Sequence, residues 1–476
     1  MPVSSRSVVV PLIVACALFM EQLDSSIIAT ALPMIAKSLH TSPLHLNLAI
    51  TSYMFSLAVF IPLSGWVADR FGARTVFRSA IVVFTLGSVL CGFSQNMGEL
   101  VAARILQGAG GAMMVPVGRL VMLRTVPRNE LVNAMAWLTT PALIGPVLGP
   151  PLGGFIVTYA SWRWIFFVNV PIGILGLVLA TLLIPNVRET NKEPLDLRGF
   201  ILMALALSGL VFGFETIGRG MLPDAMVIGL LVGGAVCLGL YFLHVRGIEH
   251  PIIDLGLARY QTYRATITGG SLFRIGIGAL PFLLPIMLQI GFGISAASSG
   301  LITFASAAGA VFMKVSAARI IRIFGFKPIL VVNTVINVVF LAGCAFFTPG
   351  TSHTAIFLFL LIGGFFRSLQ FTALNTVAYA EMPATLISRA NTLYSMLQQL
   401  ALSLGVAVGA LLLNLTMTLK GGAELGPTDF WPAYIGIGLL ALLSLPSFMM
   451  LPANAGAEMS GHVTTTIART KHGDPA

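Results

Sequence analysis

Long apolar runs alternate with short polar connectors along almost the whole chain. A helix needs about 20 apolar residues to cross a bilayer, and most of the runs reach or approach that length. We count fourteen such runs, and each predicts a membrane-spanning helix. The expected spans are residues 8–36, 46–68, 80–94, 100–123, 134–158, 164–184, 199–217, 225–243, 266–290, 296–318, 328–347, 354–379, 390–415 and 431–451. Together with short loops they fill the chain and leave no room for a soluble domain.

Basic residues in the connectors fall mainly on one side of the expected spans. With the N-terminus in the cytoplasm, 19 of the 27 Lys and Arg residues lie in cytoplasmic segments, 4 lie outside and 4 lie within spans. The cytoplasmic set includes Lys314, which we group with the basic cluster after the tenth span. The four outer residues are Lys37, Arg163, Arg219 and Lys420. This bias follows the positive-inside rule, so we expect both termini in the cytoplasm.

Composition supports a polytopic membrane protein and excludes three other classes. Hydrophobic residues make up 57% of the chain and charged residues only 9%, whereas a soluble protein carries about 25% charged residues. The chain is therefore not a soluble enzyme, a nucleic-acid-binding domain or a disordered protein, because their surfaces need far more charge. The net charge of +10 does not indicate a nucleic-acid partner, since the basic residues lie in short clusters and form no single face.

Motifs for catalysis, metal binding or nucleotide hydrolysis are absent from the sequence. The four cysteines lie inside apolar runs without a CxxC pair, which argues against a disulfide framework or a zinc site. The chain has no GxxxxGK[ST] sequence, so no P-loop ATPase drives it, and it has no HExxH sequence. We therefore expect neither an enzyme nor a cofactor.

An internal repeat predicts how the spans are grouped. Phe-Gly pairs occur after the second and the tenth expected span, and their glycines, Gly72 and Gly325, are 253 residues apart. A weaker match pairs Gly145 with Gly405, 260 residues apart. Such offsets fit two six-helix bundles separated by a two-helix insertion. We expect an N-terminal bundle at 1–185, a linker with two extra transmembrane helices at 186–265, a C-terminal bundle at 266–452 and a cytoplasmic tail at 453–476.

The connector after the second span carries a short charged motif. Its residues are Gly65, Ala68, Asp69, Arg70, Gly72 and Arg74. The glycines let the turn close tightly, and the charges can pair in one conformation and separate in another. The motif resembles the cytoplasmic signature loop of the major facilitator superfamily, although Ala73 stands where the family usually has a basic residue. The resemblance implies a gating role for Gly65, Asp69, Arg70, Gly72 and Arg74.

The fifth expected span carries a run of glycines and prolines. It contains Gly145, Pro146, Gly149, Pro150, Gly153 and Gly154. This pattern resembles the motif of the antiport branch of the superfamily and predicts a bendable, closely packed helix; an ordinary kinked helix is the alternative. Residues 23–33 and 161–173 resemble signatures of the fourteen-span drug/proton antiporter branch. Ser26 and Ala29 depart from that branch, which commonly has Thr and Asn there.

Charged residues within the spans are costly and usually functional. The superfamily lines its cavity with the first and fourth helices of each half, and here those four spans carry two acids and four arginines. Glu21 and Asp24 share a helix face, and Arg104 starts about one turn inside the outer end of its span. We expect proton coupling at Asp24, Glu21 and Arg104. We expect the substrate cavity to include Gln107, Arg274, Arg367, Gln370 and Asn375. For each arginine, the alternative is a structural role in which backbone carbonyls satisfy the charge.

These observations predict an all-α polytopic membrane protein with the major facilitator fold, that is, two six-helix bundles plus a two-helix insertion. The resemblance implies a proton-coupled exporter of small amphipathic or drug-like compounds that works by alternating access. A uniporter or symporter of a metabolite on the same fold, and a non-transporting membrane regulator, remain alternatives. The expected partners are a small-molecule substrate, protons and the lipid bilayer. The expected state is a monomer in the bacterial inner membrane.

Overall fold

The computed structural model describes residues 5–39, 43–185, 194–216, 222–248, 251–420 and 426–462, and these residues form helices without any strand. The first ten helices are α1 Ser5–Ser38, α2 Pro43–Phe60, α3 Ser64–Phe71, α4 Ala73–Phe93, α5 Met97–Thr125, α6 Leu131–Tyr159, α7 Trp164–Phe167, α8 Asn169–Leu183, α9 Leu197–Thr216 and α10 Asp224–Val245. The others are α11 Gln261–Gly278, α12 Leu280–Ile286, α13 Ala296–Phe324, α14 Phe326–Gly343, α15 His353–Val377, α16 Ile387–Lys420, α17 Phe430–Leu442, α18 Leu445–Met449 and α19 Ala457–Ser460.

Within the described residues, 13 helical segments are long and apolar enough to cross a membrane. They correspond to thirteen of the expected spans, which confirms the prediction of an all-helical polytopic membrane protein. The expected span at 134–158 lies in α6, which is helical over Leu131–Tyr159 but is not among these 13 segments. The count of fourteen spans therefore stays a prediction.

Contacts within the chain divide it into two compact units. Unit 1 contains Met1–Val126, Trp137–Leu255 and Ala384–Ser403, and unit 2 contains Pro127–Ala136, Gly256–Pro383 and Leu404–Ala476. Helices α6 and α16 each contribute residues to both units.

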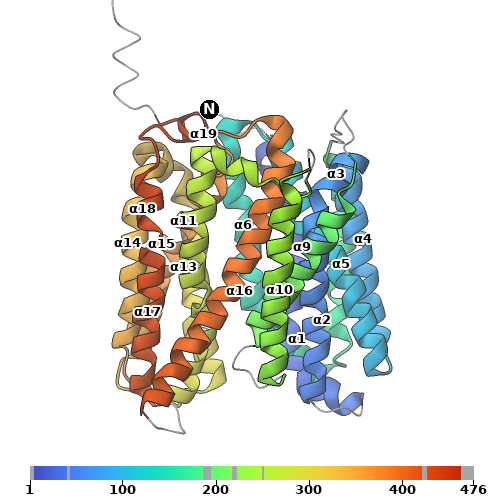
Figure 1. Cartoon of the computed structure of the whole chain (residues 1–476). Helices are drawn as coiled ribbons and strands as arrows, with labels where there is room; N and C mark the ends of the chain where they lie inside the picture. Colours follow the sequence, from blue (N-terminus) through green and yellow to red (C-terminus); the bar gives the residue numbers. More distant parts are fainter. Residues whose placement is uncertain are drawn as a thin grey trace, which may run out of the picture. The chain divides into compact units, whose positions relative to one another are not determined.

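Unit 1 is built around α5, which packs against α1, α2 and α4, while α8 covers α1 and α4. Helices α9 and α10 form a closely packed pair, seen side by side in Figure 1, and α9 in turn packs on α2. The backbones in the α9/α10 pair come close because Gly209 and Gly234 face each other's helix without a side chain between them.

Unit 2 has its tightest helix pair between α13 and α15. A Cβ atom on Gly309 would lie 1.8 Å from the carbonyl oxygen of Leu361, and one on Gly364 would lie 1.9 Å from that of Ser306. Only glycine permits such an approach, so these two positions set the contact between α13 and α15. The close approach buries side chains that follow these glycines on the same helix faces, and Lys314 is one of them.

The glycines that the repeat aligns adopt the same kind of turn. Gly72 ends α3 with a φ of 90°, and Gly325 ends α13 with a φ of 75°. Glycine reaches positive φ without the steric cost that a Cβ atom imposes, and it commonly ends helices for this reason. The two connectors therefore share a backbone turn as well as a sequence pattern.

Replacing Gly72 by alanine is expected to lower the free energy of unfolding by about 1–2 kcal/mol, because alanine is strained at a φ of 90°. The matched control is Gly229→Ala in α10, where a new Cβ atom would meet nothing within 4 Å and alanine favours the helix. Thermal unfolding of the purified variants measures both effects. Equal unfolding temperatures for the two variants would contradict the assigned turn.

Candidate functional site

An ion pair lies in the interior of unit 1, between α1 and α5. Nη1 of Arg104 is 2.6 Å from Oδ2 of Asp24, and both side chains are at most 1% exposed. Nε of Arg104 donates to the carbonyl of Ala49 in α2, and its guanidinium lies 4.3 Å from the ring centroid of Tyr53. The pair is removed from water, so its stability depends on this complete set of partners.

Asp24 also accepts hydrogen bonds from two amides. Nε2 of Gln107, one turn after Arg104 on α5, and Nδ2 of Asn169 in α8 each donate to Oδ1 at 2.8 Å. Both amides also donate to the hydroxyl of Ser88 in α4. The carboxylate of Asp24 thus accepts three hydrogen bonds, from groups on two helices, and its side chain is 0% exposed.

Glu21 lies one turn before Asp24 on α1. Its side chain is half-buried, and its Oε2 atom, like the hydroxyl of Tyr53, is buried without a hydrogen-bond partner among the described residues. No ion pair with a basic side chain is formed by Glu21 among the described residues. The two acids of α1 therefore differ in environment, since Asp24 is neutralised by a guanidinium and Glu21 is not.

The glycines of α6 pack against α1 next to Asp24. A Cβ atom on Gly145 would lie 2.9 Å from Cβ of Gln22, and one on Gly149 would lie 2.0 Å from Oγ of Ser26. The hydroxyl of Ser26 also donates to the carbonyl of Gly145 at 3.3 Å. Gly153 is buried, whereas a Cβ atom on Gly154 would meet nothing within 4 Å. The side chains of Pro146 and Pro150 lie outside the described residues.

The charged motif runs from α3 across Gly72 into α4, and contacts to other parts of unit 1 hold it in place. Asp69 forms an ion pair with Arg124 at the end of α5, with 2.6 Å between Oδ1 and Nη2. Arg74 donates to the carbonyl of Ile184, just after α8, and the guanidinium of Arg70 lies 5.6 Å from the ring of Trp66. The partner of Asp69 in this conformation is therefore Arg124, outside the motif.

The first half of α16 packs on α3 and α5 within unit 1. Gly65 receives a hydrogen bond from Ser388 at its carbonyl, and a Cβ atom there would lie 2.4 Å from Oγ1 of Thr392. Asn391 donates to the carbonyl of Pro116 at 2.7 Å, and Arg119 donates to Ser395 at 3.4 Å. Gly65 thus serves as a contact surface for α16.

The candidate cavity residues of unit 2 lie in α11 and α15. Arg274 donates to Oδ1 of Asn375 at 3.2 Å and is 1% exposed. Gln370 is fully buried and donates to Thr334 and to the carbonyl of Leu330, both in α14. Arg367 is half-buried, donates to Ser306 and lines a pocket in unit 2. The structure thus brings Arg274 together with Asn375, places Gln370 in a helix contact, and leaves Arg367 at a pocket.

Lys314 does not lie in a cytoplasmic connector, so its grouping with the basic cluster after the tenth span was wrong. It lies inside α13, is 9% exposed, and its ammonium donates to Oγ1 of Thr372 in α15 at 2.8 Å. The close approach of α13 and α15 at Gly309 and Gly364 explains this burial.

Three residues of these networks were not singled out from the sequence. Asn169 falls inside the segment that resembles the turn into the sixth span, but its polar amide at the start of an apolar helix was the only signal of a role. Ser88 carries no signal, because isolated serines are common in membrane helices. Lys314 could have been found from its position eleven residues before Gly325, the glycine that ends the helix.

Comparison with known proteins places this geometry in context. A sequence profile of the Major Facilitator Superfamily matches residues 14–406. A protein of Escherichia coli O6:H1 named "Putative multidrug resistance protein MdtD" is 39% identical over 461 residues, 96% of each chain, and a Shigella sonnei protein of the same name matches equally. The crystal structure of the human organic anion transporter MFSD10 has a similar fold, with a TM-score of 0.68 at 16% identity over 94% of this chain and 100% of that one.

Proposed function

The chain belongs to the Major Facilitator Superfamily, a family of transporters and not of enzymes, and from this premise we propose that it is a proton-coupled antiporter that exports small amphipathic compounds. The observation that carries the proposal is the buried ion pair between Asp24 and Arg104. A charge pair inside a membrane protein costs free energy to maintain, which favours a functional role over a purely structural one.

The proposed coupling follows from the partners of Asp24. Protonation of Asp24 removes its negative charge and leaves Arg104 as a buried cation without a counter-ion. That state is costly, so it favours a conformation in which Arg104 finds water or another partner. A proton from outside and a substrate from inside then favour opposite states of the transporter. The direction of transport depends only on their differential affinity for the two states.

The contacts around α6 and α16 support a role for the other motifs in the same cycle. The glycines of α6 pack directly on the turn of α1 that carries Asp24, so a bend in α6 would move the acid. Gly65 and Asp69 of α3 contact α16 and α5, so this motif would set the balance between conformations. Roles for Arg274, Asn375, Gln107 and Gln370 in binding substrate belong to this proposal as well.

We also propose how the helices are grouped, where the protein is located and which unit transports substrate. Two six-helix bundles with the insertion at 186–265 are supported by the matching turns at Gly72 and Gly325. We assign the protein to the bacterial inner membrane, with both termini in the cytoplasm, from the distribution of basic residues. We propose that one chain is the transporting unit.

Liposomes with the purified protein and an acidic interior test the proposal. An antiporter is expected to accumulate substrate inside as protons leave, and a proton ionophore should abolish the accumulation. The relatives' name directs the first panel to cationic, neutral and anionic aromatic drugs. A symporter would accumulate substrate under the opposite gradient, a uniporter would only equilibrate it, and a regulator would not move it. Any of these three results would refute antiport.

Asp69→Asn is expected to slow transport of every substrate by a similar factor, because the ion pair with Arg124 joins α3 to the end of α5 and sets conformational balance. We expect a reduction of about fivefold to tenfold, the size of a 1–1.4 kcal/mol shift between two states. Initial rates for three chemically different substrates measure it, and Asp224→Asn, an exposed acid at the start of α10, is the control. A changed ranking of substrates would contradict the gating role.

A further inference from the structure

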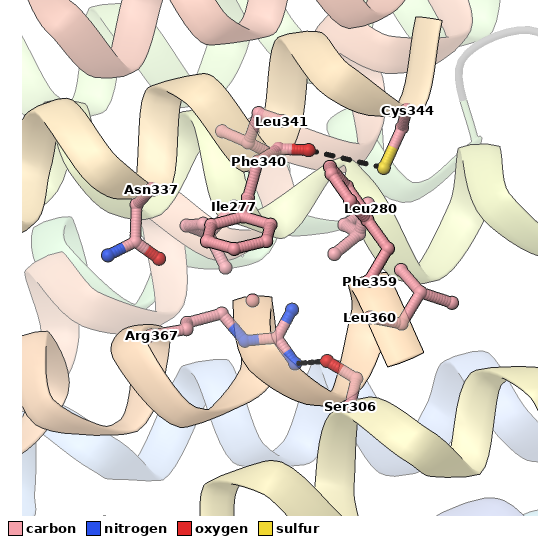
Figure 2. A pocket seen from close by; sticks show the side chains of 11 residues that line it. Ile277, Leu280, Ser306, Asn337, Phe340, Leu341, Cys344, Phe359, Leu360 and Arg367 are labelled. Carbon is pink, nitrogen blue, oxygen red and sulfur yellow. Dashed lines mark hydrogen bonds between the residues drawn. The ribbon is translucent and has the colours of Figure 1, made fainter. Parts of the chain in front are cut away.

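Two hollows in the described residues differ greatly in size. In unit 2, Figure 2 shows Phe340 and Phe359 lining a pocket with Arg367, whose guanidinium donates to Ser306. The space left in this pocket is about 20 Å³, and a cavity of this size holds about one water molecule. In unit 1, a groove between α3, α4 and α5 leaves about 370 Å³. Of the two, the groove of unit 1 has room for part of an organic molecule.

The groove is apolar and runs inward from the surface of unit 1. Among the described residues, its lining includes two hydroxyl groups and no charged side chain. Phe71 of α3 and Ser79 of α4 are exposed, whereas Ala80 of α4 and Gly110 of α5 are buried. A Cβ atom on Gly110 would lie 2.5 Å from the backbone nitrogen of Phe84. The groove therefore leads from the exposed surface to the close contact between α4 and α5.

The length of the groove matches one leaflet of a membrane. Its wall in α4 runs from Thr75, in the first turn, to Val83, halfway along the helix. These residues are about 12 Å apart along a helix that rises about 1.5 Å per residue, and each leaflet contributes about 15 Å to a hydrocarbon core of about 30 Å. On the proposed topology the groove begins at the cytoplasmic surface. Its length and lining therefore suit one acyl chain of a lipid in the cytoplasmic leaflet.

A cation lies beside the cytoplasmic end of the groove. Arg70 directly precedes the lining residue Phe71, and the ring centroid of Trp66 lies 5.6 Å from Cζ of Arg70 and 6.3 Å from the ring centroid of Phe71. Arg70 is exposed and forms no ion pair among the described residues. The neighbouring Asp69 is already paired with Arg124. An exposed guanidinium at the membrane surface attracts the phosphate groups of anionic lipids.

We propose that this groove binds one acyl chain of an anionic phospholipid, with the headgroup phosphate at Arg70. The lipid chains and the groove are equally apolar, so van der Waals packing favours the bound chain, and the guanidinium favours an anionic headgroup. The bound chain contacts Val67 and Phe71, which lie on either side of Asp69 in α3. This site goes beyond the proposed export function and does not depend on it, because binding needs neither substrate nor a proton gradient.

Native mass spectrometry of the purified full-length protein tests the headgroup, because it resolves the first lipid bound. The probes are dioleoyl phosphatidylglycerol, which is anionic, and dioleoyl phosphatidylcholine, which has the same chains and no net charge. We expect the first phosphatidylglycerol to bind about fivefold more tightly, the effect of one basic residue near an anionic headgroup. Arg70→Gln is expected to remove this preference. Arg264→Gln, which replaces an exposed arginine at the start of α11, is the control and should keep it.

Variants that fill the groove test the position of the acyl chain. Ala109→Leu occupies part of the groove from α5 and is expected to weaken binding of both lipids by about fivefold, since about ten lost atom contacts amount to that factor. Ser79→Leu fills the groove from α4 with the same expected result, and it serves if the first variant does not fold. The control is Ala102→Leu, the same substitution at an exposed position of α5 outside the groove, which should leave both affinities unchanged.

Three results would overturn the inference. Equal affinity for the two lipids is one, and a preference for phosphatidylglycerol that survives Arg70→Gln is another. The third is wild-type lipid binding in both leucine variants, which would mean that the lipid chain lies elsewhere. Loss of a dimer from the spectra of those variants would then assign the groove to a second copy of this chain. None of these measurements uses a proton gradient, so failure here leaves antiport standing, and failure of antiport leaves the lipid site standing.

Discussion

Asp24→Asn is expected to abolish accumulation of substrate driven by a proton gradient, while downhill exchange of the same substrate stays measurable. Asparagine keeps the shape of the side chain and can accept hydrogen bonds from Gln107 and Asn169, but it cannot take up a proton or attract Arg104. The accumulation ratio in liposomes should fall to about one, the value for simple equilibration. Substrate binding to the same purified variant should persist.

Glu21→Gln is the matched control, since it removes an acid from the same helix face one turn away. It lacks the ion pair of Asp24, so we expect it to reduce the rate and to preserve accumulation. If Asp24→Asn still concentrates substrate in response to the gradient, the buried pair is structural and the coupling acid lies elsewhere. If accumulation were lost in Glu21→Gln and kept in Asp24→Asn, Glu21 would be the coupling acid and Asp24 would not.

Arg104→Gln is expected to lower the free energy of unfolding by about 3–5 kcal/mol, because it leaves the buried Asp24 carboxylate without its counter-ion. Adding Asp24→Asn to this variant should restore most of the loss, since the double variant has no buried charge at this site. Denaturant unfolding of the purified proteins measures both values.

The rescue is the informative part of this experiment. The double variant should be more stable than Arg104→Gln and still be unable to couple transport to protons, which separates folding from function. Arg264→Gln provides the baseline for removing an exposed arginine. A wild-type stability for Arg104→Gln would mean that the pair is hydrated, and the account of a costly buried cation would then be wrong.

Much of the fold could be predicted because the length and apolarity of a run of residues identify it as a membrane helix. The contact between Asp24 and Arg104 is also consistent with simple depth arithmetic, since the rise of 1.5 Å per residue places both near the same level. The hydrogen-bond partners of this pair could not be predicted from the sequence in the same way. Asn169 reaches Asp24 from a helix 145 residues away in sequence, and no local pattern specifies which face of that helix points inward.

Lys314 shows a different limit. A lysine near the cytoplasmic end of a span usually extends its long side chain toward water, so counting it with the cytoplasmic residues was reasonable. The backbone contacts at Gly309 and Gly364 close that route by bringing α13 and α15 together. Burial of this residue is decided by two glycines, one near it in the chain and one on another helix, and a count of charges contains no such information.

The stretch between residues 255 and 380, which contains no Asp or Glu, has a consequence for ion leakage. A transporter that is driven by a proton gradient must not let protons or sodium ions leak across the membrane while it changes conformation. Fixed basic groups in a narrow passage repel cations, as arginines do in water-selective channels. Arg274, Lys314 and Arg367 lie inside the spans of this stretch, which has no carboxylate between residues 255 and 380, so we expect it to repel cations. In the proposed antiport cycle, protons would then cross the membrane on the acids of α1, where their movement is coupled to the movement of substrate.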